Sequence, residues 1–79
     1  MKVVVRKKQL PLVISTEFIK LEAAMKLAAL TQTGGEAKRV IQAGSVTVNA
    51  EVCTMRGKKL RPGDVFCYGG REFIIYAAQ

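Results

Sequence analysis

The sequence predicts a single α+β domain, because helix-like and strand-like patterns follow one another within 79 residues. Apolar residues recur at three- and four-residue steps in two segments between positions 17 and 43. From position 45 onward they alternate with polar residues instead. The chain is too short for two compact domains and contains no linker-like segment. Residues 1–79 are therefore expected to form one domain with a small core.

Two apolar runs near the N-terminus, Val3–Val5 and Leu12–Ile14, are rich in β-branched side chains. A polar insert that ends in Pro11 separates them. Apolar runs bounded by charge or proline are typical of strands, and we expect one or both of these runs to be strands.

The segment 17–30 predicts an amphipathic helix. Thr16 is the expected N-cap, and Glu17 would lie in the first turn, where the helix dipole favours a negative charge. Glu22 and Lys26 are four residues apart with the acid first, a pair that favours a helix. The apolar face would consist of Phe18, Leu21, Ala24, Met25 and Ala28.

The segment 36–43 predicts a second, shorter helix. Thr33 or one of the two following glycines would cap its start, with Glu36 in the first turn. Gly44 stands where a helix end prefers glycine. The glycine pair lacks the Gly-Lys-Ser/Thr ending of a nucleotide-binding loop, so it is expected to form the bend between the helices. The apolar face would consist of Ala37, Val40 and Ile41.

A hairpin is predicted after the second helix. Apolar and polar residues alternate over 45–48, Asn49 and Ala50 form a candidate turn, and Val52 resumes the pattern. The basic stretch 55–64 follows and ends in a Pro-Gly-Asp turn. Further strands are expected on either side of a Gly-Gly turn, over 65–68 and 72–78.

The charge balance points to a polyanionic partner. Thirteen Lys and Arg against six Asp and Glu give a net charge of +7. Such an excess raises the positive potential of a small protein, so nucleic acid is the expected partner, ahead of an acidic membrane surface. The apolar runs are too short and too interrupted by charge for a membrane span or a signal peptide. We therefore expect a protein of the reducing cytoplasm with no membrane partner.

Catalysis is not expected. The chain contains no His, and no nucleophile–base pairing can be derived from the spacing of its acids. Cys53 and Cys67 lack the spacing of metal ligands and are expected to be small buried apolar residues, although the sequence leaves a disulfide between them open. We predict no enzyme activity, no catalytic residue, no metal, no cofactor and no small-molecule substrate.

The cations that could contact a nucleic acid come from three segments. The outer face of the second helix would present Lys38 and Arg39 together with Gln42. The first helix adds Lys20 and Lys26, and the positions from 56 to 61 carry the four cations Arg56, Lys58, Lys59 and Arg61. Phe18 is expected in the helix seam and the other aromatic residues lie in the late strands, so recognition of backbone and shape is favoured over stacking on single bases.

Four motifs occur in order between residues 18 and 66, namely "GGEAK", "VIQAG", "VTVN" and "RPGD". Together with "FIKL" before the first helix, they resemble the S4-like RNA-binding domain, named after ribosomal protein S4, and in particular its short stand-alone bacterial members. The resemblance implies two short antiparallel helices packed on a small, mostly antiparallel β-sheet, with an alpha-L motif. It also implies that the basic side of the helices docks on structured RNA together with the hairpin.

The resemblance also indicates which positions contact RNA. Lys20 would open the first helix, Thr33 the second, and Asn49 the hairpin turn. Gly34 stands where many members carry an arginine, and Ala50 replaces the usual glycine of the turn, which would strain or alter it. The complete set of candidate RNA-binding residues is Lys20, Lys26, Thr33, Gly34, Lys38, Arg39, Gln42, Asn49, Arg56, Lys58, Lys59 and Arg61.

We therefore predict a monomeric, non-catalytic protein whose cations neutralise the phosphates of structured RNA, either ribosomal RNA or transfer RNA, with the ribosome as a candidate site of action. Two alternatives remain. One is an adaptor whose basic face docks on an acidic ribosome-associated protein, and the other is a DNA-binding protein, since DNA carries the same phosphates.

Overall fold

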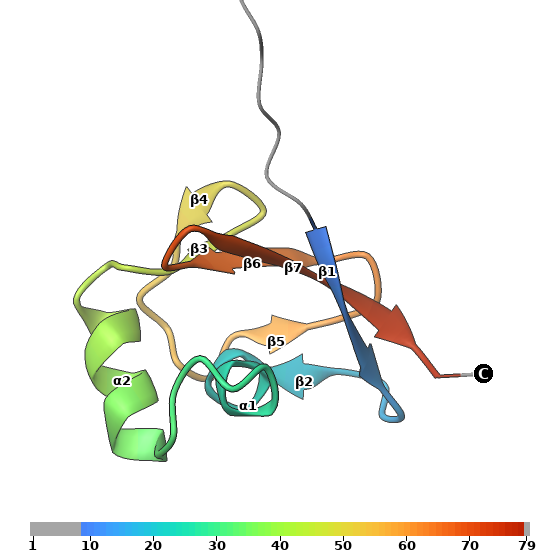
Figure 1. The fold of residues 1–79 in the computed structure, drawn as a ribbon, viewed down its shortest axis with the longest axis horizontal. Helices are drawn as coiled ribbons and strands as arrows, with labels where there is room; N and C mark the ends of the chain where they lie inside the picture. Colours follow the sequence, from blue (N-terminus) through green and yellow to red (C-terminus); the bar gives the residue numbers. More distant parts are fainter. Residues whose placement is uncertain (1–8, 79) are drawn as a thin grey trace, which may run out of the picture.

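The computed structural model describes residues 9–78, which form seven strands and two helices (Figure 1). Helices and strands mix along the chain, which confirms the α+β class. The strand predicted at Val3–Val5 lies outside the described residues. In chain order the elements are β1 (Gln9–Ile14), β2 (Ile19–Lys20), α1 (Leu21–Leu27), α2 (Gly34–Gln42), β3 (Thr47–Val48), β4 (Glu51–Val52), β5 (Lys59–Leu60), β6 (Val65–Tyr68) and β7 (Arg71–Ala77).

Five strands form one sheet in the order β1-β7-β6-β3-β4. Three of its pairings are antiparallel, whereas β1 runs parallel to β7 with Leu12 opposite Ile75. The sheet is therefore mostly antiparallel, as predicted. Pro11 was expected in a polar insert but lies inside β1. It is tolerated there because β1 is an edge strand, where a missing N–H costs no ladder hydrogen bond.

A second, two-stranded sheet was not predicted. It pairs β2 with β5 in antiparallel orientation, with Ile19 opposite Leu60 and Lys20 opposite Lys59. Figure 1 shows this small sheet on the same side of the large sheet as α1. The basic stretch 55–64 is thus partly a strand and not only a turn.

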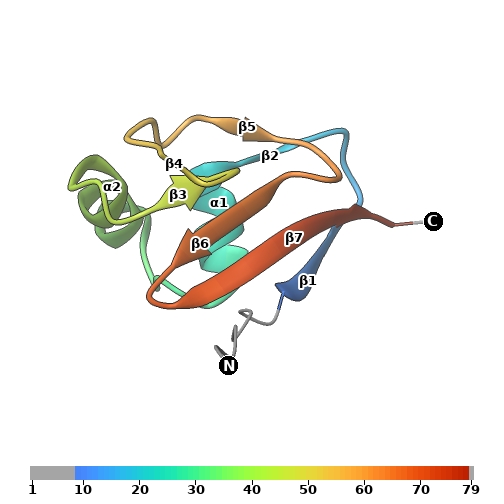
Figure 2. The same cartoon turned by 90° about the horizontal axis from the view of Figure 1, so that it is seen from above.

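The core lies between the large sheet and the layer formed by α1 and the β2–β5 pair (Figures 1 and 2). The rings of Phe66 and Phe73 stack within the core with their centroids 5.3 Å apart. Burial of these apolar side chains supplies most of the stability that so small a protein can gain. The buried hydrophobic residues are Leu12, Ile14, Leu21, Ala24, Met25, Ala37, Ile41, Val46, Val48, Leu60, Phe66, Phe73 and Ile75.

Helix α1 is shorter than the predicted segment 17–30, and its start was predicted wrongly. Residues 19 and 20 pair as a strand, and Lys20 occupies the N-cap position in place of Thr16, whose hydroxyl donates to the Phe18 carbonyl at 2.7 Å. The amide of Leu21 donates to the carbonyl of Lys58 at 2.8 Å. The carbonyl of a residue far away in the sequence thus takes the place of a side-chain cap at the start of α1.

The end of α1 also comes early, because Ala29 adopts a left-handed backbone conformation with φ of 59°. The amides of Ala29 and Leu30 donate to the carbonyls of Lys26 and Met25, which is the Schellman arrangement that closes a helix.

The two helices point in different directions. In Figure 1, α1 is seen along its axis and α2 from the side, whereas in Figure 2, α1 is seen from the side and α2 along its axis. The two helices therefore cross, which corrects the expectation that they are antiparallel.

Helix α2 and the hairpin follow the sequence closely. Thr33 caps α2, which begins at Gly34 and so includes both glycines that were expected to precede it. The left-handed Gly44, with φ of 80°, ends the helix as predicted. Asn49 and Ala50 form a two-residue turn with φ of 51° and 71°, so Ala50 takes a conformation that glycine prefers. None of the helices formed by residues 9–78 is long and apolar enough to cross a membrane.

Candidate nucleic-acid interface

Five cations gather where the β2–β5 pair meets the start of α1, and we call them the loop cluster. Two backbone hydrogen bonds hold this region together, from Leu21 to Lys58 at 2.8 Å and from Glu22 to Arg56 at 3.1 Å. Lys20 faces Lys59 across the strand pair, so residues that are 39 positions apart become neighbours. All five side chains are exposed. The loop cluster consists of Lys20, Arg56, Lys58, Lys59 and Arg61.

Phe18 lies beside the loop cluster, although the sequence pattern placed it in a helix seam. The Lys59 ammonium lies 4.9 Å from the centre of its ring, and the Arg61 guanidinium carbon lies 5.8 Å away. Both distances are within the range of cation–π attraction. A half-buried aromatic ring therefore helps to position two of the cations. The sequence pattern could not predict this position of Phe18, because the position depends on the pairing of β2 with β5, two strands of two residues each that lie far apart in the sequence.

A second basic surface covers the outer side of α2, and we call it the helix cluster, which consists of Lys38, Arg39 and Gln42. These three side chains are exposed, whereas Ala37 and Ile41 of the same helix are fully buried. The amphipathic division predicted from the sequence is confirmed. Lys26 is exposed in the last turn of α1, at the other end of that helix from Lys20.

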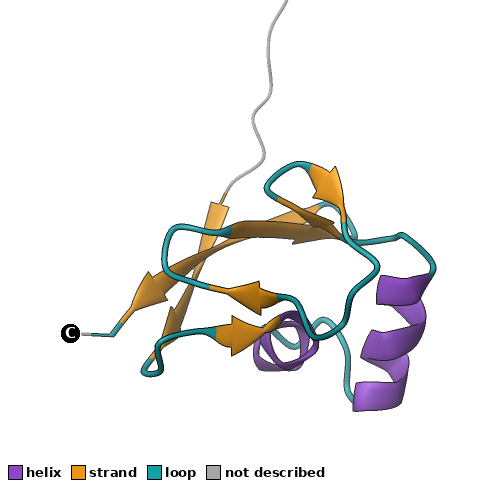
Figure 3. Ribbon diagram, turned by 180° about the vertical axis from the view of Figure 1, so that it is seen from behind, coloured by secondary structure: helices purple, strands orange, loops and turns teal. Residues whose placement is uncertain are grey.

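The segment between β4 and β5 connects the two surfaces. At its start, the amide of Cys53 donates to the carbonyl of Val46 at 3.0 Å, just beyond the C-terminal end of α2. At its end, the carbonyls of Arg56 and Lys58 accept the first amides of α1. Figure 3 shows this loop as it runs from the hairpin past the helices to β5. The loop that carries Arg56 and Lys58 is therefore anchored at one end beside the hairpin and at the other end on the start of α1.

Thr33, a predicted contact residue, uses its side chain within the fold. The Thr33 hydroxyl accepts the amide of Glu36 at 3.1 Å, and the Glu36 carboxylate accepts the amide of Gln32 at 2.7 Å. These paired bonds fix the start of α2. Gly34 lies within this first turn of α2, with open space where a side chain would project. A backbone approach to Gly34 is therefore unobstructed.

Asn49 holds the hairpin turn against the 64–65 segment. Its side-chain amide donates to an Asp64 carboxylate oxygen at 3.2 Å, and its side-chain oxygen accepts the amide of Val65 at 3.0 Å. Asp64 also accepts the amide of Arg61 at 2.8 Å. This chain of bonds connects the hairpin turn to the last residue of the loop cluster, so Asn49 acts on that cluster through the backbone.

Residues 9–78 offer no cluster of side chains for a metal ion. That part of the chain contains no group of three His, Cys, Asp or Glu residues that could hold a metal ion. Cys53 and Cys67 are both half-buried, whereas the sequence predicted buried residues. The Cys53 thiol lies 3.7 Å from the carbonyl oxygen of Met55 and donates to it.

Comparison with known proteins agrees with this architecture. The family model described as the S4 domain matches residues 12–76, which include both clusters and the whole hairpin. The chain is also 46% identical over 55 residues to a Bacillus subtilis protein described as "Probable ribosome maturation protein RlbA". That match covers 70% of this chain and 78% of the relative. On both grounds, the chain belongs to the S4 domain family.

Proposed function

We propose that this protein is a single-domain, non-catalytic RNA-binding protein that acts in the cytoplasm on structured RNA of the ribosome. The observation that carries the proposal is the loop cluster, in which backbone pairing holds five exposed cations at one end of α1. Exposed cations on a backbone that is already ordered bind phosphates with a smaller loss of conformational entropy than cations on a flexible chain. Membership of the S4 domain family and the described role of the Bacillus relative both support RNA of the ribosome as the partner.

The mechanism is neutralisation of phosphates by two surfaces at once. The loop cluster would contact one stretch of backbone and the helix cluster another, with Lys26 as a further contact at the other end of α1. The open space at Gly34 would let a phosphate come close to the main chain. Because the major groove of an RNA duplex is too narrow for side chains to read, shape would dominate over base sequence. Thr33 and Asn49 would act by fixing the orientation of these surfaces.

The proposal is tested by a binding panel across a salt series. The probes are a structured ribosomal RNA fragment, a transfer RNA, a single-stranded RNA and a DNA duplex. We expect tightest binding to one of the structured RNAs, with a linear fall of log affinity against log salt. Equal binding of DNA would favour a general phosphate binder. Capture of acidic ribosome-associated proteins after nuclease treatment, without RNA binding, would favour the adaptor.

A further inference from the structure

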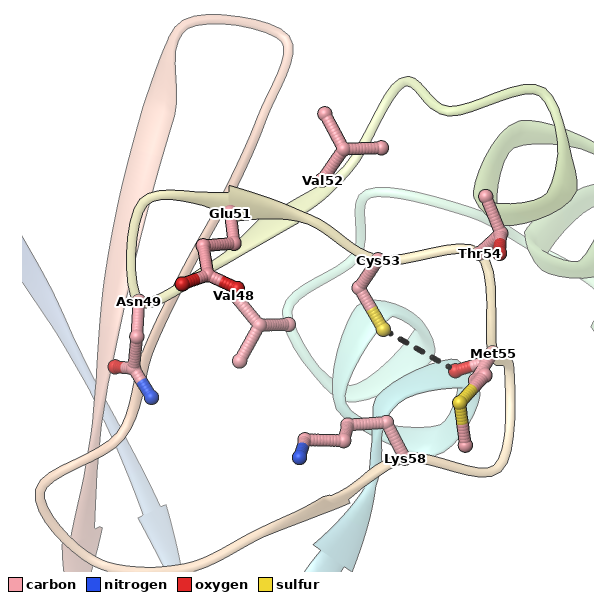
Figure 4. Close-up of a pocket in the computed structure, with 8 residues that line it drawn as sticks. All are labelled: Val48, Asn49, Glu51, Val52, Cys53, Thr54, Met55 and Lys58. Atoms are coloured by element: carbon pink, nitrogen blue, oxygen red, sulfur yellow. Dashed lines mark hydrogen bonds between the residues drawn. The ribbon is translucent and has the colours of Figure 1, made fainter.

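A pocket of about 400 Å³ opens between the hairpin and the loop cluster (Figure 4). Its lining includes the buried Val48, the half-buried Cys53 and the exposed Met55 as apolar surface. Glu51 and Lys58 border the same pocket and add a carboxylate and an ammonium group. Lys58 is also a member of the loop cluster, so the pocket is continuous with the proposed phosphate-binding surface.

From this lining we infer that the pocket receives one unpaired base of the bound RNA, an inference that rests on the proposed function. The face of a base is apolar and would cover Val48, Cys53 and Met55. Its edge carries both donors and acceptors, which match the Glu51 carboxylate and the Lys58 ammonium. The phosphate of the same nucleotide would remain outside, beside the neighbouring cations of the loop cluster.

The charges of the pocket favour a base over other occupants. A phosphate inside it would lie against the Glu51 carboxylate, and the acidic side chain of a protein partner would meet the same repulsion. An apolar side chain would bury Glu51 and Lys58 without satisfying their hydrogen bonds, which is costly. A base satisfies both groups and covers the exposed Met55, of which 64% is accessible.

Met55 is the residue that separates this inference from plain phosphate binding. It is uncharged and its side chain is exposed, so Met55→Ser removes apolar surface without changing the charge or the core. Val13→Ser is the matched control, because Val13 is 56% exposed and lies on β1, at the opposite edge of the sheet from β4. Neither change should unfold the protein.

The experiment compares two synthetic RNA hairpins that differ by one unpaired 2-aminopurine in the stem. We expect the wild-type protein to bind the bulged hairpin about tenfold more tightly, because the base covers a small apolar surface, and we expect a change in 2-aminopurine fluorescence. Met55→Ser should reduce this preference to near unity and leave the salt dependence unchanged, whereas Val13→Ser should keep the tenfold preference.

Four outcomes would overturn the inference in distinguishable ways. Salt-dependent but equal binding of both hairpins by the wild-type protein would contradict the base pocket alone. Retention of the preference in Met55→Ser would place the unpaired base elsewhere. Absence of salt-dependent binding to either hairpin would contradict the proposed function as well. In the fourth outcome, the two hairpins bind equally while Met55→Ser binds ribosomal particles more weakly than the wild-type protein does. That result would indicate that the pocket receives a side chain of a ribosomal protein and not a base.

Discussion

At the scale of single residues, the structure separates side chains that can contact RNA from those that shape the surface. Lys38 and Arg39 project from α2 as the sequence predicts. Thr33 and Asn49, assigned to RNA contact by resemblance, use their oxygens on backbone amides of the fold. A sequence pattern identifies the type of residue at a position, but it does not reveal which hydrogen bonds that side chain already makes.

The helix cluster provides the sharpest residue-scale prediction. Removal of both charges in Lys38→Ala/Arg39→Ala should weaken binding to structured RNA and reduce the slope of log affinity against log salt by about 1.4–1.8, or about 0.7–0.9 per lost phosphate contact. Arg71→Ala is the control, since Arg71 is the one cation among residues 9–78 that lies outside the candidate set. Titrations at several salt concentrations measure both variants, and an unchanged slope in the double variant would remove α2 from the interface.

A buried hydroxyl leads to a prediction on stability. Thr31 is 4% exposed, and its hydroxyl oxygen has no hydrogen-bond partner among the described residues. Thr31→Val keeps the shape of the side chain and removes the unsatisfied group, so the free energy of unfolding should rise by about 1 kcal/mol. Thr54→Val, at an exposed position, should change it by less than about 0.5 kcal/mol. Urea denaturation measures both, and a less stable Thr31→Val would indicate a polar partner for this hydroxyl.

At the scale of elements, helices and strands with a strong local sequence pattern were predictable, whereas very short strands that depend on distant partners were not. Helix α2 has a capping residue, a periodic apolar face and a glycine end, and all three features are visible in the sequence. Strands β2 and β5 have two residues each, which is too short for any periodicity, and they are stabilised by one another. The β2 pairing replaces the first turn of the predicted helix, so the assembly of the loop cluster could not be predicted from either segment alone.

Two alanines in left-handed conformation provide the element-scale prediction. Ala29 ends α1 and Ala50 completes the hairpin turn, each at a position that suits glycine. Left-handed backbone costs a residue other than glycine about 1–2 kcal/mol, partly offset by the greater freedom of unfolded glycine. Ala29→Gly and Ala50→Gly should each raise the free energy of unfolding by about 0.5–1 kcal/mol.

The control for the glycine substitutions is Ala43, the right-handed C-cap of α2 with φ of −75°. Ala43→Gly should lower the free energy of unfolding by about 0.5–1 kcal/mol. Alanine is not strained in a right-handed conformation, so the substitution only adds the larger conformational entropy that glycine loses on folding. Thermal or urea denaturation provides the comparison. Destabilisation by Ala50→Gly would show that the turn differs from the geometry described above.

At the scale of the whole molecule, the sequence predicted the content of the fold better than its arrangement. The strands and helices are mostly where periodicity placed them, yet the parallel pairing of β1 with β7 joins segments about 60 residues apart. The crossing of α1 and α2 is likewise set by the Ala29 turn and by packing on the sheet, not by the pattern of either helix. The sequence therefore predicted which residues are basic and exposed, while the structure was needed to group them.

The central claim is that RNA binds through the loop and helix clusters, and an NMR titration of the isotope-labelled protein with structured RNA tests it most directly. We predict that the amide shifts of 56–61 and of α2 change during the titration. The shifts of Val13 and Tyr76, neighbours on the exposed side of the β1–β7 pair, should stay constant. Changes confined to β1 and β7, with 56–61 and α2 unaffected, would contradict the account.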